Sequence, residues 1–596
     1  MTGHRVRAAS GLIAGIIDVS GQPIISRKVL KFIPMHSEGN LIALVYCREG
    51  APLITRCLLV TRKPNVLWVS FEDCVPFFGC YGDPVATTPT VDQLASEGCI
   101  YPNAFSTAPI CAPARAAVIT GMYPTSIGAH HMRTSRGEGY DAPVPHHVKC
   151  LGEYFRREGY YCSNNVKTDY QFQAPFAAWD DCSNNAHWRN RPDPEVPFFA
   201  VFNPEYTHES GMWEEHRNRP VMVHPEAKFE ALTDPEAVEV PPYFPDTPKV
   251  RKSIAKNYDN IAQCDKVMAQ LLEQLEKDGL ADNTIVVLWS DHGPMPRGKR
   301  HLYDQGTHSP MIIRWPGVIE PGTTNDRLVS TIDLGATMLS ACDITVPPHM
   351  QGKAFLGNQI TTERQYVHAS VDRSDGDHDM LRSVRDKRYK FIKNGFPEKP
   401  YLIWNGFRNN HPIMQEWYRC WMDGTLNETQ AIMFAEKRPV EELYDTETDP
   451  WEVHNLAEDE GHQSVLDDMR QELKSWQTET GDLGLLDERV MKLLNRPDGE
   501  KPVATEAKCL MFAGDEYGQT RAPDAFSVPQ HHRLQLFSPT QGNSICYTLE
   551  EGEEVFWQVF NAPIILPVGS YRLRTIVSRI GYDSSPEKVF EITVEA

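Results

Sequence analysis

Short apolar runs recur along the chain from Asn65 onward. Residues 66–71 and 284–289 are apolar except for Ser70 and Thr284, as expected for strands that are buried on both faces of a sheet. Residues 160–162, 196–203 and 309–314 are three further candidate strands. Glu72-Asp73 follow the first of these runs directly, and Asp291-His292 follow the run 284–289 after Ser290.

Helical patterns lie between these strands. In residues 250–279, apolar side chains recur at steps of three and four residues, with Asp265 as an exception and Gly279 as a stop. Residues 89–98, 151–159 and 333–342 predict shorter helices. Strands that alternate with helices favour an α/β fold with a mostly parallel sheet covered on both faces. In such a sheet, the functional site lies beyond the carboxyl ends of the strands.

The pattern changes on both sides of this region. Residues 1–63 hold short apolar runs at 41–46 and 58–61, which predict either a small hairpin or an extension outside the main fold. Residues 356–495 combine short strands (366–371, 388–392, 442–444) with an amphipathic helix at 464–480, so we expect a smaller α+β subdomain. After a polar linker, residues 506–596 alternate as an all-β module and predict a β-sandwich. The main α/β domain then covers residues 64–355.

Composition narrows the class of protein. Of the 596 residues, 41% are hydrophobic and 23% charged, which is typical of a globular protein with a large core. The net charge of −21 gives no support to nucleic acid or an anionic membrane as a partner, so an anionic substrate would need local basic residues. Fourteen cysteines are too few for a disulfide scaffold. There is no run of 18 apolar residues that would predict a transmembrane segment, and no clean signal peptide.

The most informative segment begins at Cys111. Pro113 and the alanines up to Gly121 predict a helix that starts at Cys111, where the helix dipole favours an anion. Arg115 lies one turn further on the same face, so a nucleophile and a guanidinium would face one anionic group. A tyrosine-phosphatase loop is excluded, because it needs arginine at position 117, which is Ala. A buried structural cysteine beside a surface arginine would fit this segment equally well.

Cys111, Pro113 and Arg115, followed by Thr120-Gly121, resemble the signature of the type I sulfatases of the alkaline phosphatase-like superfamily. The resemblance runs from about residue 65 to about residue 485 and is nearest to the heparan N-sulfatase (sulfamidase) branch, through residues 240–248, 290–303 and 442–445. It implies an alkaline phosphatase-like αβα sandwich with a smaller α+β C-terminal subdomain. In this family a maturation enzyme oxidises the cysteine to Cα-formylglycine.

The resemblance also implies a metal site. Glu72 and Asp73 match the first pair of family ligands, although Asp-Asp is more common there, and Asp291 and His292 match the second pair beside Cys111. The family usually holds Ca²⁺, and the histidine leaves room for Mn²⁺ or another transition ion. Taken alone, Glu72-Asp73 would be interpreted as a solvated turn, but Asp291-His292 at the end of another strand favours the metal site.

Further roles follow from the same resemblance. Lys167 and Lys299 match the two active-site lysines, and His208 matches the sulfate-binding histidine. The family commonly has histidine two residues after the first lysine, where this chain has Asp169. The implied mechanism is attack on sulfur by a hydroxyl of hydrated formylglycine, charge stabilisation by the basic residues, and protonation of the leaving group by His208 or Lys299.

Indications of the substrate are fewer. His130, His131 and Arg133 follow the signature helix and, with Arg382 of the smaller subdomain, are either substrate-binding or surface residues. Residues 566–574 and 579–582 resemble the chitobiase/β-hexosaminidase C-terminal domain, which accompanies carbohydrate-active enzymes. We therefore expect a sulfatase that removes O- or N-linked sulfate from a carbohydrate such as a glycosaminoglycan. A phosphonate or phosphate ester hydrolase and an inactive glycan-binding protein are the alternatives. The family is commonly periplasmic or secreted, whereas the missing signal leaves a cytoplasmic location open.

Overall fold

The computed structural model describes residues 30–34, 41–45, 58–60, 62–132, 142–213, 232–374, 378–496, 498–513, 520–553 and 555–596. The chain divides into two compact units, residues 1–63 and residues 64–596. The first unit contains a three-stranded antiparallel sheet of β1 (Leu30–Pro34), β2 (Leu41–Val45) and β3 (Leu58–Val60). The apolar runs predict β2 and β3, and β1 is an additional strand.

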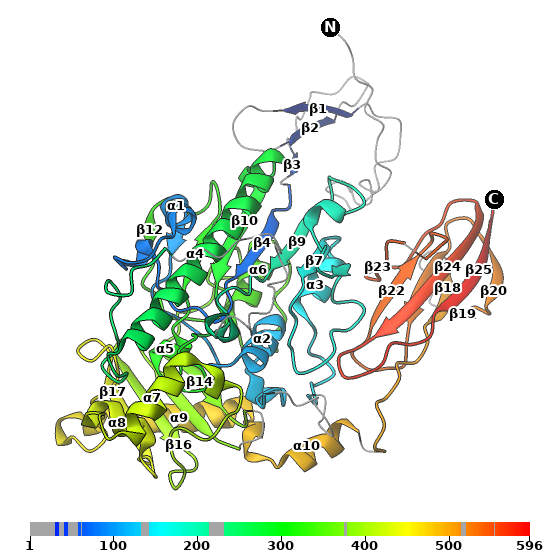
Figure 1. Ribbon diagram of the computed structural model, residues 1–596. Coiled ribbons are helices and arrows are strands. Elements are labelled where there is room, and N and C mark those ends of the chain that lie inside the picture. Colours follow the sequence, from blue (N-terminus) through cyan, green and yellow to red (C-terminus); the bar gives the residue numbers. More distant parts are fainter. Residues whose placement is uncertain are drawn as a thin grey trace. The chain divides into compact units, whose positions relative to one another are not determined.

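An eight-stranded sheet forms the centre of the second unit, in the order β12-β5-β11-β10-β4-β9-β7-β8. Figure 1 labels β12, β10, β4, β9 and β7 of this sheet. Its strands are β4 (Asn65–Ser70), β5 (Cys99–Ile100), β7 (Tyr161–Asn165), β8 (Asp181–Cys182), β9 (Phe198–Phe202), β10 (Thr284–Trp289), β11 (Met311–Arg314) and β12 (Thr323–Thr324). Neighbours are parallel except at β11, which runs antiparallel to β10 and to β5. The predicted α/β fold with a mostly parallel sheet is confirmed.

Alternate side chains of each strand enter two apolar cores, one on each face of the sheet. Val66 and Trp68 of β4 face the core under α2 (Cys111–Thr120), α3 (Leu151–Arg157) and α6 (Asp333–Ala341). Leu67 and Val69 face the core under α1 (Pro89–Glu97) and α4 (Pro248–Lys277). Asp265, the exception in the pattern of α4, accepts hydrogen bonds from the first N–H groups of α1 and so joins the two helices. The strands and helices therefore form an αβα sandwich.

The smaller subdomain is built on a four-stranded antiparallel sheet. Its strands are β14 (Val367–Val371), β15 (Leu381–Arg385), β16 (Tyr389–Asn394) and β17 (Glu441–Asp445), in that order. The helices α7 (Pro412–Met422), α9 (Gln463–Thr480) and α10 (Glu488–Asn495) belong to the same region of the chain. The apolar pattern predicts α9 and three of the strands, but it misses β15, α7 and α10.

The C-terminal module has two sheets, in the orders β19-β18-β21 and β20-β25-β24-β22-β23, around one apolar core. Its strands are β18 (Lys508–Phe512), β19 (Thr520–Arg521), β20 (Ala525–Pro529), β21 (Arg533–Phe537), β22 (Ser544–Thr548), β23 (Gln558–Val559), β24 (Gly569–Ser578) and β25 (Lys588–Glu595). The module contacts the main α/β domain, where Lys149 Nζ donates to the carbonyls of Gly542 and Asn543 at 3.0 Å. Among the described helices, none combines the length and the apolar character needed to cross a membrane.

Candidate active site

The two predicted pairs of metal ligands lie side by side at one edge of the central sheet. Strands β4 and β10 are parallel neighbours, with Ser70 opposite Trp289, so Glu72-Asp73 and Asp291-His292 leave the sheet together. The N–H of Asp73 donates to Oδ1 of Asp291 at 3.0 Å. All four side chains are fully buried, so the interpretation of Glu72-Asp73 as a solvated turn is wrong.

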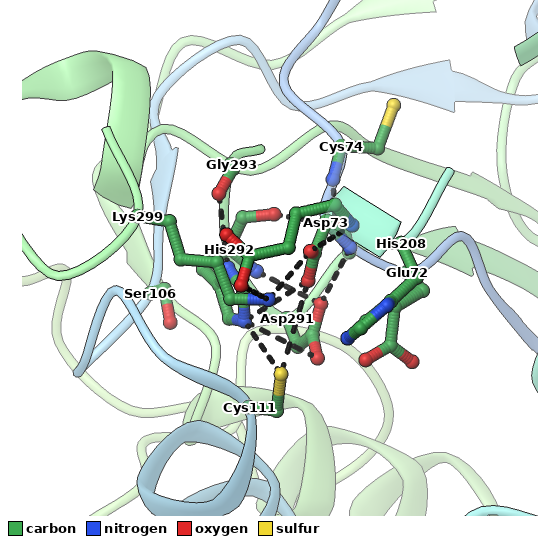
Figure 2. A network of polar contacts seen from close by, with 12 residues as sticks. Glu72, Asp73, Cys74, Ser106, Cys111, His208, Asp291, His292, Gly293 and Lys299 are labelled. Atoms are coloured by element: carbon green, nitrogen blue, oxygen red, sulfur yellow. Dashed lines mark hydrogen bonds and ion pairs between the residues drawn. The ribbon is translucent and has the colours of Figure 1, made fainter. Parts of the chain in front are cut away.

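Cys111 is the first residue of α2, as its sequence context predicts. Its Sγ lies 3.2 Å from Nε2 of His292 and 3.8 Å from Oδ1 of Asp73 (Figure 2). One ligand atom from each of Asp73, Cys111, Asp291 and His292 lies within 4.8 Å of the others. Burial raises the pKa of the Cys111 thiol well above its usual range. The unmodified side chain is therefore a protonated thiol, which is a poor nucleophile.

Arg115 occupies the predicted place one turn along α2 and faces the same cluster. Its guanidinium donates to Asp291 Oδ2 at 3.1 Å, to Glu72 Oε2 at 2.7 Å and to Asn203 Oδ1 at 2.8 Å. Only 4% of the side chain is exposed, which excludes the alternative of a surface arginine. Burial lowers the pKa of Arg115, but the carboxylates of Glu72 and Asp291 raise it more, so the guanidinium is charged.

Both predicted lysines reach this cluster. Lys299 Nζ lies 2.6 Å from Oδ2 of Asp73, and Lys167 Nζ contacts Oε1 of Glu72. Burial lowers the pKa of each lysine, whereas the neighbouring carboxylates raise it more, so both are ammonium groups at neutral pH. Three cations are thus held on carboxylates around Cys111, although the chain as a whole carries a charge of −21.

His208 approaches the cluster from the loop after β9. A ring nitrogen of His208 lies within 4.8 Å of ligand atoms of Glu72, Asp73 and Cys111. Its Nδ1 is hydrogen-bonded to Ser210 Oγ at 2.7 Å. Burial lowers the pKa of His208 well below the usual range, and the charges of Lys299 and Lys167 lower it further. The imidazole is therefore neutral at neutral pH.

Two residues of this site were not predicted from the sequence. Asn203 follows β9 and accepts the hydrogen bond from Arg115. The N–H of Glu209 donates to Oδ2 of Asp73 at 2.7 Å, and its carboxylate pairs with Arg300 at 2.8 Å and lies 3.7 Å from Lys299 Nζ. Asn203 is the last residue of the strand predicted at 196–203, and Glu209 lies in the loop after it, so their place at the end of a buried strand was the available signal.

The predicted substrate-binding residues contact the smaller subdomain. His131 is buried and its Nδ1 accepts from the N–H of Arg373 at 3.1 Å. Arg382, only 3% exposed, pairs with Asp372 and Asp482. His130 is buried against the ring of His131. Arg133 lies outside the described residues. Contact of these residues with a substrate stays a prediction.

The chemistry of the donor set fits a divalent cation. Asp73, Asp291 and His292 converge with Cys111 in one group, and Glu72 converges with Asp73, Cys111 and His208 in a second group. The carboxylates and the imidazole of His292 are buried. Burial raises the pKa of Asp73, and the like charges of Glu72 and Asp291 raise it further, whereas the charge of Lys299 lowers it. A divalent cation would stabilise these converging carboxylates. Oxygen donors suit a hard ion such as Ca²⁺, and the imidazole also suits a transition ion.

Comparisons with known proteins agree with this arrangement. Residues 64–344 match the family model described as Sulfatase, and residues 292–404 match that described as N-sulphoglucosamine sulphohydrolase, C-terminal. A 2-O GAG sulfatase of known structure has a TM-score of 0.51 and 21% identity, covering 70% of this chain and 93% of its own, which shows the same fold.

Two relatives extend the likeness to the sequence. An N-sulphoglucosamine sulphohydrolase from Homo sapiens is 26% identical over 487 residues, covering 72% of this chain and 93% of that protein. An ulvan-active sulfatase from Formosa agariphila is 39% identical over 571 residues, covering 90% of this chain and 92% of that protein. The chain therefore belongs to the sulfatase family and is a sulfatase.

Proposed function

We propose that this sulfatase removes sulfate, as an O-sulfate ester or an N-sulfate, from a sulfated carbohydrate, through a formylglycine formed from Cys111. The observation that carries the proposal is the place of Cys111, 3.2 Å from His292 and 3.8 Å from Asp73 in a buried cluster that includes three cations. The relatives named as an ulvan-active sulfatase and an N-sulphoglucosamine sulphohydrolase support a saccharide substrate.

Glu72, Asp73, Asp291 and His292 would hold a divalent cation, for which we propose Ca²⁺, with Mn²⁺ as the alternative. When bound, the cation supplies positive charge that polarises a sulfuryl oxygen and favours a deprotonated hydroxyl beside it. The hydrated aldehyde at position 111 supplies two hydroxyl groups, one as the nucleophile and one that later helps to expel sulfate. An unmodified cysteine has neither, which is why the maturation enzyme is an expected partner.

The basic residues stabilise charge on the sulfuryl group. Arg115, Lys167 and Lys299 are already oriented by their carboxylate partners, so little reorganisation is needed when negative charge grows on the sulfuryl oxygens. Asp291 accepts from Arg115 and is the carboxylate suited to take a proton from the hydroxyl at position 111.

A proton must also reach the leaving alcohol or amine. Lys299 stays protonated because Asp73 and Glu209 raise its pKa against the effect of burial. His208 is neutral, because burial and the two lysines lower its pKa. Lys299 is therefore the better candidate for the proton donor, and His208 is suited to hydrogen-bond the sulfate or the leaving oxygen.

Two measurements on one preparation test the proposal. The protein is expressed with a formylglycine-generating enzyme, and the peptide that contains residue 111 is analysed by mass spectrometry. Sulfate release from a panel of O- and N-sulfated saccharides, including ulvan oligosaccharides, is measured by ion chromatography. We expect the aldehyde at position 111 and release from at least one saccharide. Turnover with thiol alone would contradict the role of formylglycine.

The same experiment separates the alternative functions. Turnover of an aryl phosphonate ester with no release from any sulfated saccharide would favour the phosphonate ester hydrolase. Binding of saccharides by fully converted protein without turnover would favour a glycan-binding protein.

A further inference from the structure

A pocket beside the active site is lined by residues that the proposed mechanism does not use. It lies between the loop after Lys299 and the segment 401–408 of the smaller subdomain. The lining residues that matter here are Arg300, His301, Asp372, Ser374, Trp404 and Arg408.

The pocket adjoins the sulfate-cleaving cluster on two sides. Arg300 follows Lys299 in the chain, and its guanidinium pairs with Glu209, which lies 3.7 Å from Lys299 Nζ. On the other side, the ring centroid of Phe407 lies 6.1 Å from that of His208. A saccharide whose sulfate reaches Lys299 and His208 would therefore extend its neighbouring residue toward this pocket.

Two polar groups that line the pocket lack a hydrogen-bond partner within the described part of the chain. They are Nε2 of His301 and Oγ of Ser374. His301 is only 5% exposed, and a buried polar group without a partner is costly unless water or a ligand completes it. Both groups can donate a hydrogen bond, so a ligand with acceptor oxygens would satisfy them.

The charges around the pocket favour an anionic ligand. Burial lowers the pKa of His301, and the charges of four nearby arginines lower it further, so the imidazole is neutral and keeps one N–H. These arginines are Arg408, Arg438, Arg297 and Arg300. The carboxylates of Asp372 and Asp379 also line the pocket, but they pair with Arg382 and Arg438. Arginine is suited to carboxylate and sulfate groups, because its planar N–H groups match their oxygens.

Trp404 adds an apolar face to the same pocket. Its side chain is 67% exposed, and an exposed large apolar group beside convergent polar groups is a feature of ligand-binding sites. The ring of Trp404 can cover the C–H face of a sugar, while the donors opposite bind the charged substituent of that sugar.

We propose that this pocket binds a second anionic group of the substrate, a carboxylate or another sulfate, on the sugar next to the one that loses sulfate, with Trp404 stacked on that sugar. The proposal rests on the proposed function, because it places the neighbour of the cleaved group.

Four substrates test the subsite. They share the sulfated residue that the panel identifies, presented alone as a methyl glycoside or linked to glucose, to glucuronate or to sulfated glucose. For the wild type, we expect kcat/KM on at least one anionic disaccharide to exceed that on the glucose disaccharide by about tenfold or more. One hydrogen bond to a charged group contributes a factor of about this size. Comparison of the glucuronate disaccharide with the sulfated glucose disaccharide shows whether the pocket binds a carboxylate or a sulfate.

Variants connect this preference to the pocket. Arg408→Gln should abolish the preference for the anionic disaccharide, and Trp404→Ala should raise KM for every disaccharide relative to the monosaccharide. Arg419→Gln and Trp421→Ala, on exposed positions of α7, are matched controls that keep both preferences. If Arg408→Gln does not fold, Ser374→Ala replaces it, with a smaller loss of the same preference.

Equal kcat/KM for the glucose and both anionic disaccharides in the wild type would overturn the proposal. A preference that survives Arg408→Gln and Ser374→Ala in folded protein would overturn it too. If no substrate releases sulfate, the proposed function fails, and calorimetric binding of the same four compounds still tests the subsite.

Discussion

Replacing Arg382 with methionine tests whether this buried cation holds the smaller subdomain together or binds substrate. Its guanidinium contacts Asp482 at 2.7 and 2.9 Å and Asp372 at 3.1 Å through two hydrogen bonds. Without it, two buried carboxylates lose their cation, and removing one partner of a buried ion pair costs about 3–5 kcal/mol. At roughly 2 cal/mol/K per residue, a unit of about 500 residues would lose about 3–5 °C in Tm.

The loss should depend on pH through Asp372. Burial raises the pKa of Asp372 to about 6, although Arg382 lowers it. Without Arg382 that pKa rises further. A carboxyl whose pKa is raised by folding stabilises the protein at low pH, and this contribution is lost as the pH rises through the folded pKa. Arg382 also lowers the pKa of Asp482 against the effect of burial, and stability from a lowered carboxyl pKa is already present near pH 5. The difference in Tm between wild type and Arg382→Met should therefore be present near pH 5 and widen as the pH rises above about 6.

Differential scanning calorimetry at pH 5 and pH 8, combined with KM for the identified saccharide, is the assay. Arg489→Met is the matched control, because Arg489 is 89% exposed and its partner Asp487 is 49% exposed. Surface pairs contribute about 0–1 kcal/mol, so this control should change Tm by about 1 °C or less. An unchanged Tm of Arg382→Met at both pH values, with a raised KM, would refute the structural role and support substrate binding.

Three further predictions concern the site and the fold. Lys299→Met should lower kcat by about 100- to 1000-fold with a smaller change in KM, because the lysine acts on developing charge; kcat within tenfold of wild type would contradict this. Dialysis against a chelator should abolish sulfate release, and Ca²⁺ or Mn²⁺ should restore it; full activity in protein shown by elemental analysis to be metal-free would exclude the cation site. Asp265→Asn should lower the free energy of unfolding by about 1–3 kcal/mol, because Asp265 accepts from two N–H groups of α1, and an unchanged denaturation midpoint would contradict that role.

The sequence predicts well which candidate metal ligands gather at one edge of the sheet, because these side chains follow strand ends. The runs at 66–71 and 284–289 are apolar enough to identify buried strands, so Glu72, Asp73, Asp291 and His292 stand out as the polar residues that follow them. Which strands are neighbours depends on packing between residues about 220 positions apart, and no local pattern records that pairing.

The missed elements have physical reasons. Strand β15 has a polar sequence because it contains Arg382 and Arg385, which are buried in ion pairs with Asp482 and Asp304 from distant segments. Asn203 and Glu209 are single polar residues whose roles come from contacts with Arg115 and Asp73. Such roles depend on tertiary contacts, so a sequence can indicate candidates for them but not the contacts themselves.

The most direct test of the account relates conversion of Cys111 to catalysis. Preparations made with different levels of the formylglycine-generating enzyme would contain different fractions of aldehyde at position 111, measured by mass spectrometry. The rate of sulfate release from the identified saccharide should rise in proportion to that fraction and reach zero when only thiol is present, and Cys111→Ala should be folded and inactive at every level. A rate independent of the converted fraction, or turnover by Cys111→Ala, would contradict the role of Cys111.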